Sequence, residues 1–136
     1  MQLNPYLNFN GNCEEALKFY EKALPAKIVV SMTYGGSPMA KQMPPEVHNK
    51  IMHARLDVKG QTIMASDAMC DHYEKPTGFN ITLNTDDPAE AERLFKALSE
   101  KGNICMKLEE TFWAQRFGML VDQFGIPWMI NCEKKN

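Results

Sequence analysis

Two stretches of the chain repeat the same order of hydrophobic and polar positions. The first is NPYLNFNGNCEEALKFYEKAL at residues 4–24, and the second is NITLNTDDPAEAERLFKALSEKG at residues 80–102. In each, a short alternating segment is followed by apolar residues spaced as on one face of a helix. The pattern therefore predicts a strand followed by a helix in both stretches.

The starts and the end of these helices have local signals. Asn12 is followed three residues later by Glu15, and Asp87 by Glu90, and both pairs resemble a capping box. Gly102 provides a stop for the second helix. We therefore expect one helix to begin near residue 12 and the other near residue 87.

Three β-type segments follow each predicted helix. They lie at 27–34, 50–58 and 61–67 after the first helix, and at 103–110, 115–122 and 126–132 after the second. Lys59 and Gly60 form a hairpin signal between two of them. The two copies are offset by 75–76 residues, which indicates a duplicated module of strand, helix and three strands.

These elements predict an α+β fold in which helices cover one face of a mostly antiparallel sheet. We expect one domain over residues 1–136, with a first module at about 1–68, a linker at 69–78 and a second module at about 79–136. Residues 35–49 hold three prolines and no periodicity, and a loop of this length in a compact domain is usually functional or mobile.

Strand alternation gives each sheet an apolar face and a mixed face. In the last strand, Trp128 and Ile130 share the apolar face, and Met129 lies on the other. In the stretch FWAQRFGMLVDQFGIPWMIN at 112–131, we also expect Phe117, Met119 and Val121 to face the core, and Trp113, Arg116 and Met129 to lie on the mixed face. The mixed face is either solvated or, if the sheet curls, the lining of a cavity.

Composition excludes several classes of protein. The apolar fraction of 44% and the charged fraction of 24% are typical of globular domains. A net charge of −2 without a basic stripe argues against nucleic-acid or anionic-membrane partners. Neither a membrane-spanning apolar run nor a signal sequence is present, so a cytoplasmic location is expected.

The four cysteines stand at positions 13, 70, 105 and 132, with no CxxC pair. Widely spaced cysteines in a chain without a secretion signal are usually reduced, and this favours free thiols over disulfides or a zinc site. Cys13 lies in the first turn of a predicted helix, where the helix dipole lowers a thiol pKa. The alternative, a small buried residue, is favoured.

Three segments of the chain resemble a known family. NPYLNFNGNCEEALKFYEKAL, MHARLDVKGQTIMASDA and FWAQRFGMLVDQFGIPWMIN are similar to the PhnB-like subfamily of the vicinal oxygen chelate superfamily, which includes glyoxalase I, extradiol dioxygenases and antibiotic-resistance proteins. The resemblance covers essentially the whole chain. It implies two βαβββ modules in a curved eight-strand sheet around a cavity, with helices on the convex face, and a homodimer.

The subfamily often carries the name 3-demethylubiquinone 3-methyltransferase. In this sequence, no predicted strand is followed by the glycine-rich loop that a nucleotide-like cofactor needs. We therefore expect no such cofactor.

The resemblance also locates the metal ligands of metal-using relatives, which come from the first and last strand of each module. The corresponding residues here are Asn4, about Met64, Asn80 and Met129. Hard divalent ions prefer carboxylate or imidazole ligands, and thioethers suit softer ions. The sequence thus predicts that the metal site of the family is absent, even if a shift in strand alignment brings in Ser66 or Asp67.

The mixed faces supply the candidate ligand-binding residues. They are Asn4, Tyr6, His53, Arg55, Met64, Ser66, Asn80, Trp113, Arg116 and Met129. His53 beside Arg55 is a candidate general acid or base, or else a structural histidine. Arg116 either clamps an anion or forms a rim salt bridge. His48 and His72 are interpreted as surface residues.

Three functions remain open. The favoured one is binding of a small molecule of unknown identity without turnover. The second is a lyase, isomerase or dioxygenase that uses an unrecognised metal or metal-free acid–base chemistry by His53 with Arg55 or Arg116. The third is a non-catalytic interaction protein.

Overall fold

The computed structural model describes residues 1–68 and 72–135, and within them the chain forms two compact units. The boundary between the units lies between Glu74 and Lys75, inside the stretch 69–78 that the sequence predicts as a linker. Cys70 lies outside the described residues. In the part of the chain that is described, no helix is both long and apolar enough to cross a membrane.

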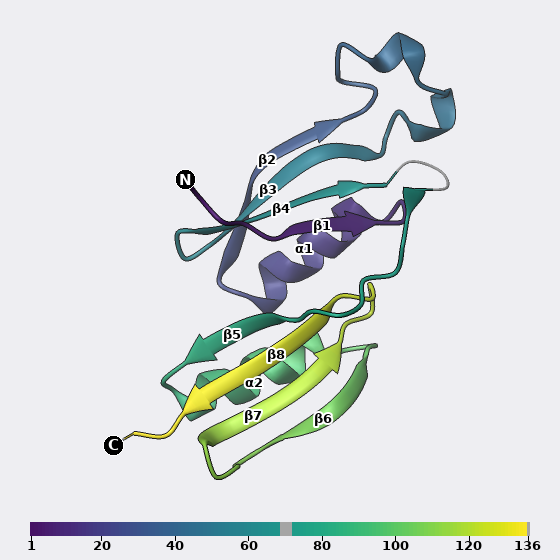
Figure 1. Cartoon of the computed structure of the whole chain (residues 1–136). Helices are drawn as coiled ribbons and strands as arrows, with labels where there is room; N and C mark the ends of the chain where they lie inside the picture. Colours follow the sequence, from purple (N-terminus) through teal and green to yellow (C-terminus); the bar gives the residue numbers. More distant parts are fainter. Residues whose placement is uncertain (69–71, 136) are drawn as a thin grey trace. The chain divides into compact units, whose positions relative to one another are not determined.

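The first unit contains one helix and one four-stranded sheet (Figure 1). Its elements are β1 (Tyr6–Phe9), α1 (Cys13–Ala23), β2 (Ala26–Thr33), β3 (Ile51–Val58) and β4 (Gln61–Asp67), with short 3₁₀ helices at Ala40–Gln42 and Pro45–Val47. The strand order is β1-β4-β3-β2. β1 is parallel to β4, and the other two pairs are antiparallel.

The second unit repeats this arrangement. Its elements are β5 (Ile81–Thr85), α2 (Pro88–Leu98), β6 (Asn103–Glu109), β7 (Ala114–Val121) and β8 (Pro127–Glu133). The strand order β5-β8-β7-β6 matches that of the first unit, again with one parallel pair. The α+β fold and the two βαβββ modules predicted from the sequence are confirmed.

The eight strands lie in two four-stranded sheets, where the family resemblance implied one sheet of eight. Each module completes its own sheet because its first strand pairs in parallel with its own last strand. No strand pairing between the two modules is found among the described residues.

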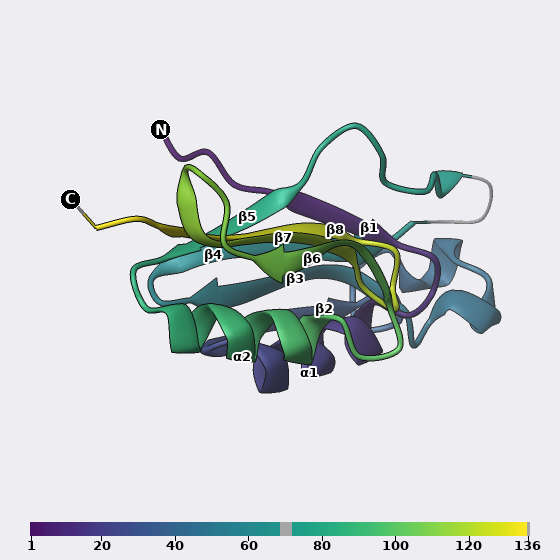
Figure 2. The ribbon, with the colours of Figure 1, turned by 90° about the horizontal axis from the view of Figure 1, so that it is seen from below.

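Each helix packs its apolar face against one side of the sheet in its own unit (Figure 2). The buried residues are Cys13, Ala16, Leu17 and Tyr20 in α1, and Ala91, Leu94, Phe95 and Leu98 in α2. On β8, every second residue is buried, and Trp128 and Ile130 have 0% exposure. Each sheet therefore has a covered face and a helix-free face.

The two predicted capping boxes have different outcomes. Asp87 accepts a hydrogen bond from the Ala89 amide at 3.0 Å and so caps α2 as predicted. Asn12 forms no side-chain cap, so that prediction is wrong. The Cys13 amide at the start of α1 instead donates to the carboxylate of Asp67, at the end of β4, at 2.9 Å.

The predicted hairpin at Lys59 and Gly60 is confirmed. The two residues have φ of 51° and 85°, the positive values that a two-residue type I′ turn needs. Gly60 adopts this conformation without the steric cost that a side chain brings, and β3 returns directly into β4.

The prediction for the side chains of β7 is wrong by one residue. Ala114, Gly118 and Leu120 are the buried ones, whereas Phe117 and Met119 are half-exposed on the other face; Val121 is half-exposed as well. Gly118 lies at a core-facing position that has no room for a side chain. A Cβ there would lie 2.8 Å from Phe95 Cε2 and 3.0 Å from Leu108 Cα. A glycine in the core breaks the apolar periodicity from which the strand was read.

The long stretch at 35–49 has local structure of its own. The Tyr34 amide donates a hydrogen bond to the Lys50 carbonyl at 3.0 Å. The β2–β3 hydrogen-bond ladder therefore continues into the start of this stretch. His48 Nε2 lies 2.9 Å from the Ala40 carbonyl oxygen and 3.0 Å from that of Met43. His48, interpreted from sequence as a surface residue, thus ties both 3₁₀ helices together.

Candidate functional site

The helix-free face of the first sheet brings several predicted site residues together. Strand register places Tyr6 of β1 beside Met64 of β4, Met64 beside Arg55 of β3, and Arg55 beside Val30 of β2. These side chains form one row across all four strands. Alternation places them opposite the buried row beneath α1.

His53 lies between Tyr6 and Arg55 on this face. Its Nδ1 is 3.4 Å from the Tyr6 hydroxyl, and its Nε2 accepts from Arg55 Nε at 3.4 Å. The Tyr6 and His53 rings are 5.9 Å apart, tilted by 32°. When Nε2 of a neutral imidazole accepts, the proton is on Nδ1, and the imidazole donates to the Tyr6 oxygen.

The surroundings of this group are partly apolar and open to solvent. Tyr6, Val30 and Met32 are exposed, with 43%, 39% and 41% of their surface accessible. Ser66, another predicted site residue, is buried and lies beside Asn8 at the end of the β1–β4 pair. We call Tyr6, His53 and Arg55, with Met64, Val30 and Met32 around them, the first-sheet face.

Two asparagines predicted for the site lie elsewhere. Asn4 precedes β1, and its side-chain amide donates to the Thr62 carbonyl at 3.1 Å. Asn80 precedes β5. The residues beside Met64 and Met129 are Tyr6 and Thr82. In each module, the asparagine assigned from sequence therefore lies two residues before the residue that pairs with the methionine.

The helix-free face of the second sheet has the matching rows. Thr82 lies beside Met129, which lies beside Met119. Thr82 Oγ1 donates to Met129 Sδ at 3.6 Å. The next row contains Asn84 and Asn131. Met129 is thus on the helix-free face, as the sequence predicted.

Arg116 does not share this face with Met129. It lies beside Cys132, which is buried beneath α2, and its Nε donates to Glu92 of α2 at 3.1 Å. Its Nη1 also donates to the Gln115 carbonyl at 2.7 Å. Of the two interpretations made from sequence, the salt bridge at the rim is the one the structure shows.

The thiol of Cys13 is not activated by the helix start. Burial, followed by the nearby carboxylates of Asp67 and Glu14, raises the pKa of Cys13 to about 12. Its side chain has 0% exposure, so the favoured alternative, a small buried residue, is correct. Burial also raises the pKa of Cys132, whereas Cys105 is exposed.

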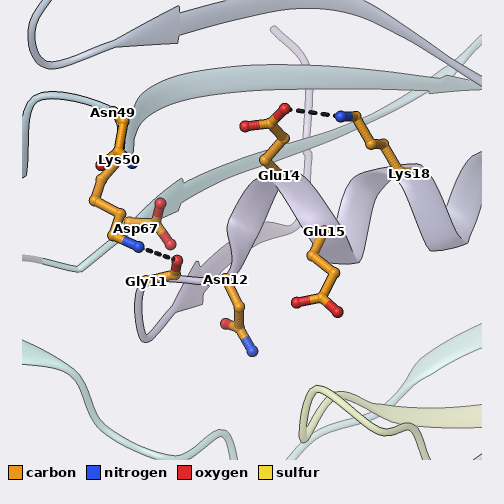
Figure 3. A pocket seen from close by; sticks show the side chains of 8 residues that line it. All are labelled: Gly11, Asn12, Glu14, Glu15, Lys18, Asn49, Lys50 and Asp67. Carbon is orange, nitrogen blue, oxygen red and sulfur yellow. Dashed lines mark hydrogen bonds and ion pairs between the residues drawn. The ribbon is translucent and has the colours of Figure 1, made fainter.

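A pocket of about 330 Å³ lies beside the start of α1 (Figure 3). It is lined by Gly11, Asn12, Glu14, Glu15, Lys18, Asn49, Lys50 and Asp67. Lys50 Nζ donates to the Gly11 carbonyl at 2.9 Å, and Lys18 pairs with Glu14 at 2.8 Å (Figure 3). The Lys50 contact holds the turn between β1 and α1, and the pair of Lys18 with Glu14 is an i,i+4 ion pair along α1.

Asp67, which sequence reasoning considered only as a residue that a shifted alignment brings to the family's metal position, has a structural role in this pocket. One carboxylate oxygen accepts from the Cys13 amide, and the other accepts from the Ile51 amide, both at 2.9 Å. Its backbone carbonyl accepts from the Tyr34 hydroxyl at 3.0 Å. The sequence signal for this role was weak, because the partners are distant along the chain.

Residues 1–131 match the protein family described as 3-demethylubiquinone-9 3-methyltransferase. The chain belongs to this family. It is PhnB-like, as the three sequence segments indicated, and thus a member of the vicinal oxygen chelate superfamily.

Three relatives match this PhnB-like chain over nearly its full length. Protein PA1353 from Pseudomonas aeruginosa is 47% identical, with a TM-score of 0.90 and 99% of each chain covered. Protein YjdN from Escherichia coli is 37% identical over 143 residues, covering 99% of this chain and 97% of YjdN. A PhnB protein from Bacillus cereus is 25% identical, with a TM-score of 0.83 and coverage of 97% and 99%.

The fold alone is shared more widely. The fosfomycin resistance protein FosX of Listeria monocytogenes is 9% identical, with a TM-score of 0.70 over 98% of this chain and 94% of FosX. At this identity, only the arrangement of the βαβββ modules is comparable.

The residues of this PhnB-like chain at the family's metal positions do not fit a hard divalent ion. The positions assigned from the family resemblance hold Asn4, Met64, Asn80 and Met129, and the residues beside the two methionines are Tyr6 and Thr82. Hydroxyl and thioether groups are weak ligands for such ions, which prefer carboxylate or imidazole. Among the described residues, no group of three or more histidine, cysteine, aspartate or glutamate side chains is placed to hold a metal.

Proposed function

We propose that the protein binds a small organic molecule on the first-sheet face. The observation that carries this proposal is the Arg55 guanidinium. It is exposed, its Nε contacts the ring of His53, and it forms no ion pair with any described residue. An exposed cation positioned by a neighbouring ring is available to a ligand.

The chemistry of the face favours an anionic ligand with an apolar part. The free edge of a guanidinium binds a carboxylate or phosphonate through parallel hydrogen bonds. The Tyr6 hydroxyl adds a further donor beside it. Met64, Val30 and Met32 offer adaptable apolar contact, as methionine does at binding surfaces.

Phenylphosphonate is a suitable probe, because it combines an anion with an aromatic ring. Isothermal titration calorimetry should show saturable binding to the unmodified protein. Arg55→Leu should weaken binding at least tenfold, since charge-assisted hydrogen bonds contribute about 1.5–3 kcal/mol. Arg93→Leu is the matched control, because Arg93 lies on α2 and pairs with Glu90 at 3.5 Å. Equal losses in the two variants would contradict the proposal.

A second candidate function is metal-free acid–base catalysis by His53. The contact between Tyr6 and His53 at 3.4 Å favours it, because a hydrogen-bonded hydroxyl and imidazole can pass a proton to a ligand. Here His53→Gln should abolish turnover of a bound compound while leaving its affinity within a fewfold of the original. If the variant loses affinity and no product is formed by the unmodified protein, binding without turnover is supported.

A further inference from the structure

The turn between β1 and α1 contains a chemically labile pair of residues. Asn10 is the only asparagine of the chain that precedes a glycine, and it is exposed. Gly11 has a φ of 88°, the left-handed conformation that glycine adopts at little cost. Because glycine has no side chain, nothing on the residue itself blocks its backbone nitrogen from approaching the carboxamide carbon of the preceding asparagine.

The backbone nitrogen of Gly11 is available for this approach. Its N–H makes no hydrogen bond to any other residue in the part of the chain that the structure describes. The neighbouring Asn12 differs, since the Cys13 amide that follows it donates to the Asp67 carboxylate at 2.9 Å. The turn therefore exposes one asparagine to attack by the next amide and protects another.

A cation lies against the same glycine. Lys50 Nζ donates to the Gly11 carbonyl at 2.9 Å, and it lies 3.5 Å from the position that a Cβ on Gly11 would take. The carboxylates of Glu14, Glu15 and Asp67 line the same pocket, but the Lys50 ammonium is the charged group that touches Gly11. Nearby positive charge stabilises the anion that forms when an amide nitrogen loses its proton.

We propose that Asn10 is a site of spontaneous deamidation, assisted by Lys50. The Gly11 nitrogen, after losing its proton, attacks Cγ of Asn10, and ammonia leaves as a five-membered succinimide forms. Water then opens the ring at either carbonyl, so that the product is aspartate or isoaspartate. The net change is the uptake of one water and the release of one ammonia, without any oxidant or cofactor.

The second module already carries a carboxylate at the equivalent place. Asp86 directly follows β5, as Asn10 directly follows β1. An aspartate immediately after the strand is therefore compatible with this module. Asn10→Asp supplies the aspartate product as a reference for chromatography.

Peptide mass spectrometry of the folded protein, aged at pH 8, tests the site. Trypsin releases residues 1–18 as one peptide, which contains Asn4, Asn8, Asn10 and Asn12, so that three asparagines serve as controls within the same molecule. The mass change of amide to acid should build up first at Asn10. It should not build up at position 10 in Asn10→Gln over the same period.

Lys50→Met tests the assistance by the ammonium group. A unit charge at about 4 Å changes a rate about fivefold in water, so the folded variant should convert about fivefold more slowly. Lys27→Met is the matched control, because Lys27 is an exposed lysine on β2, and it should leave the rate unchanged. In urea, where the contact with Gly11 is lost, Lys50→Met and the unmodified protein should convert at the same rate.

Three outcomes overturn the inference. They are conversion of Asn8 or Asn12 as fast as that of Asn10, an equal or faster rate in folded Lys50→Met, and no conversion of the folded protein over a period in which the unfolded protein converts. The last outcome would mean that the folded turn holds the Asn10 carboxamide away from the Gly11 nitrogen.

Discussion

Asp122 is a buried carboxylate that organises the turn between β7 and β8. One of its oxygens accepts from the backbone amides of Phe124 and Ile126 at 2.8 and 3.0 Å, and the other accepts from the Trp128 indole at 2.8 Å. Trp128 is the largest fully buried side chain of the protein's described part. The turn and the core of the second unit therefore depend on one side chain.

Replacement of Asp122 should be costly. Asp122→Ala removes the acceptor of these three hydrogen bonds, and we expect the free energy of unfolding to fall by about 3 kcal/mol or more. Chemical denaturation measures this loss, with the exposed Asp86→Ala as the control. A loss below about 1 kcal/mol would show that other groups or water replace the carboxylate.

Cys13 should make stability depend on alkaline pH. Its pKa is about 12 in the folded protein, against an ordinary value of 9.0, so between these pH values the folded state keeps a proton that the unfolded state releases. Stability then falls as pH rises above 9, by about 1.4 kcal/mol per unit at most. Denaturation at several pH values should show a shallower decline in Cys13→Ala.

The same burial predicts the reactivity of the thiols. In a Cys70→Ser background at pH 8, iodoacetamide should modify the exposed Cys105 well before Cys13 or Cys132. Modification of Cys13 at the rate of Cys105 would contradict its assignment as an inert core residue.

At the scale of elements, Gly118 permits the packing of α2 against β7. A Cβ at this position would approach the Phe95 ring at 2.8 Å and the Leu108 backbone at 3.0 Å. Gly118→Ala should therefore reduce the free energy of unfolding by about 1–3 kcal/mol through overpacking. The double variant with Phe95→Leu should recover part of the loss, and strictly additive effects would show that the two residues do not compete for space.

The elements themselves were largely predictable from the sequence. The predicted β-type segments after each helix end within about a residue of the ends of the observed strands. They were predictable because a two-residue or helical repeat of apolar residues depends only on neighbouring positions in the sequence. The side-chain faces of β7 were not predictable. Its register with β6 and β8 is irregular, and Gly118 takes a core position that no hydropathy pattern marks.

The candidate site was predictable only in part. Tyr6, His53 and Arg55 were assigned to the mixed faces by alternation and Met64 by the family resemblance, and the structure places the four residues together. Arg116 was misassigned together with the rest of β7, because it alternates with Gly118 and Leu120 and so lies on the face that packs beneath α2. The Asn84–Asn131 pair depends on strand register between segments 47 residues apart, which the sequence does not reveal.

At the scale of the whole molecule, the duplication extends to single positions. Tyr6 with Met64 and Thr82 with Met129 occupy the same places in the two modules. On the helix-free face, the first module carries Arg55 and His53, whereas the second carries the Asn84–Asn131 amides and aromatic rings. Duplication thus provided two scaffolds whose helix-free faces carry different chemistry.

The family resemblance predicts a homodimer. The outer strands β2 and β6 expose apolar side chains, including Val29 at 55% and Ile104 at 51%, and a partner chain would cover such surface. Light scattering coupled to size exclusion should give twice the 15.5 kDa of a single chain. A mass of one chain across micromolar concentrations would contradict this expectation.

Binding on the first-sheet face is the central claim, and titration of the isotope-labelled protein with phenylphosphonate, followed by backbone-amide NMR, tests it most directly. The account predicts saturable shifts concentrated at Tyr6, His53, Arg55 and Met64, with those shifts lost in Arg55→Leu. Absence of saturable shifts, or shifts concentrated around Glu14 and Lys18 at the pocket beside α1, would contradict it.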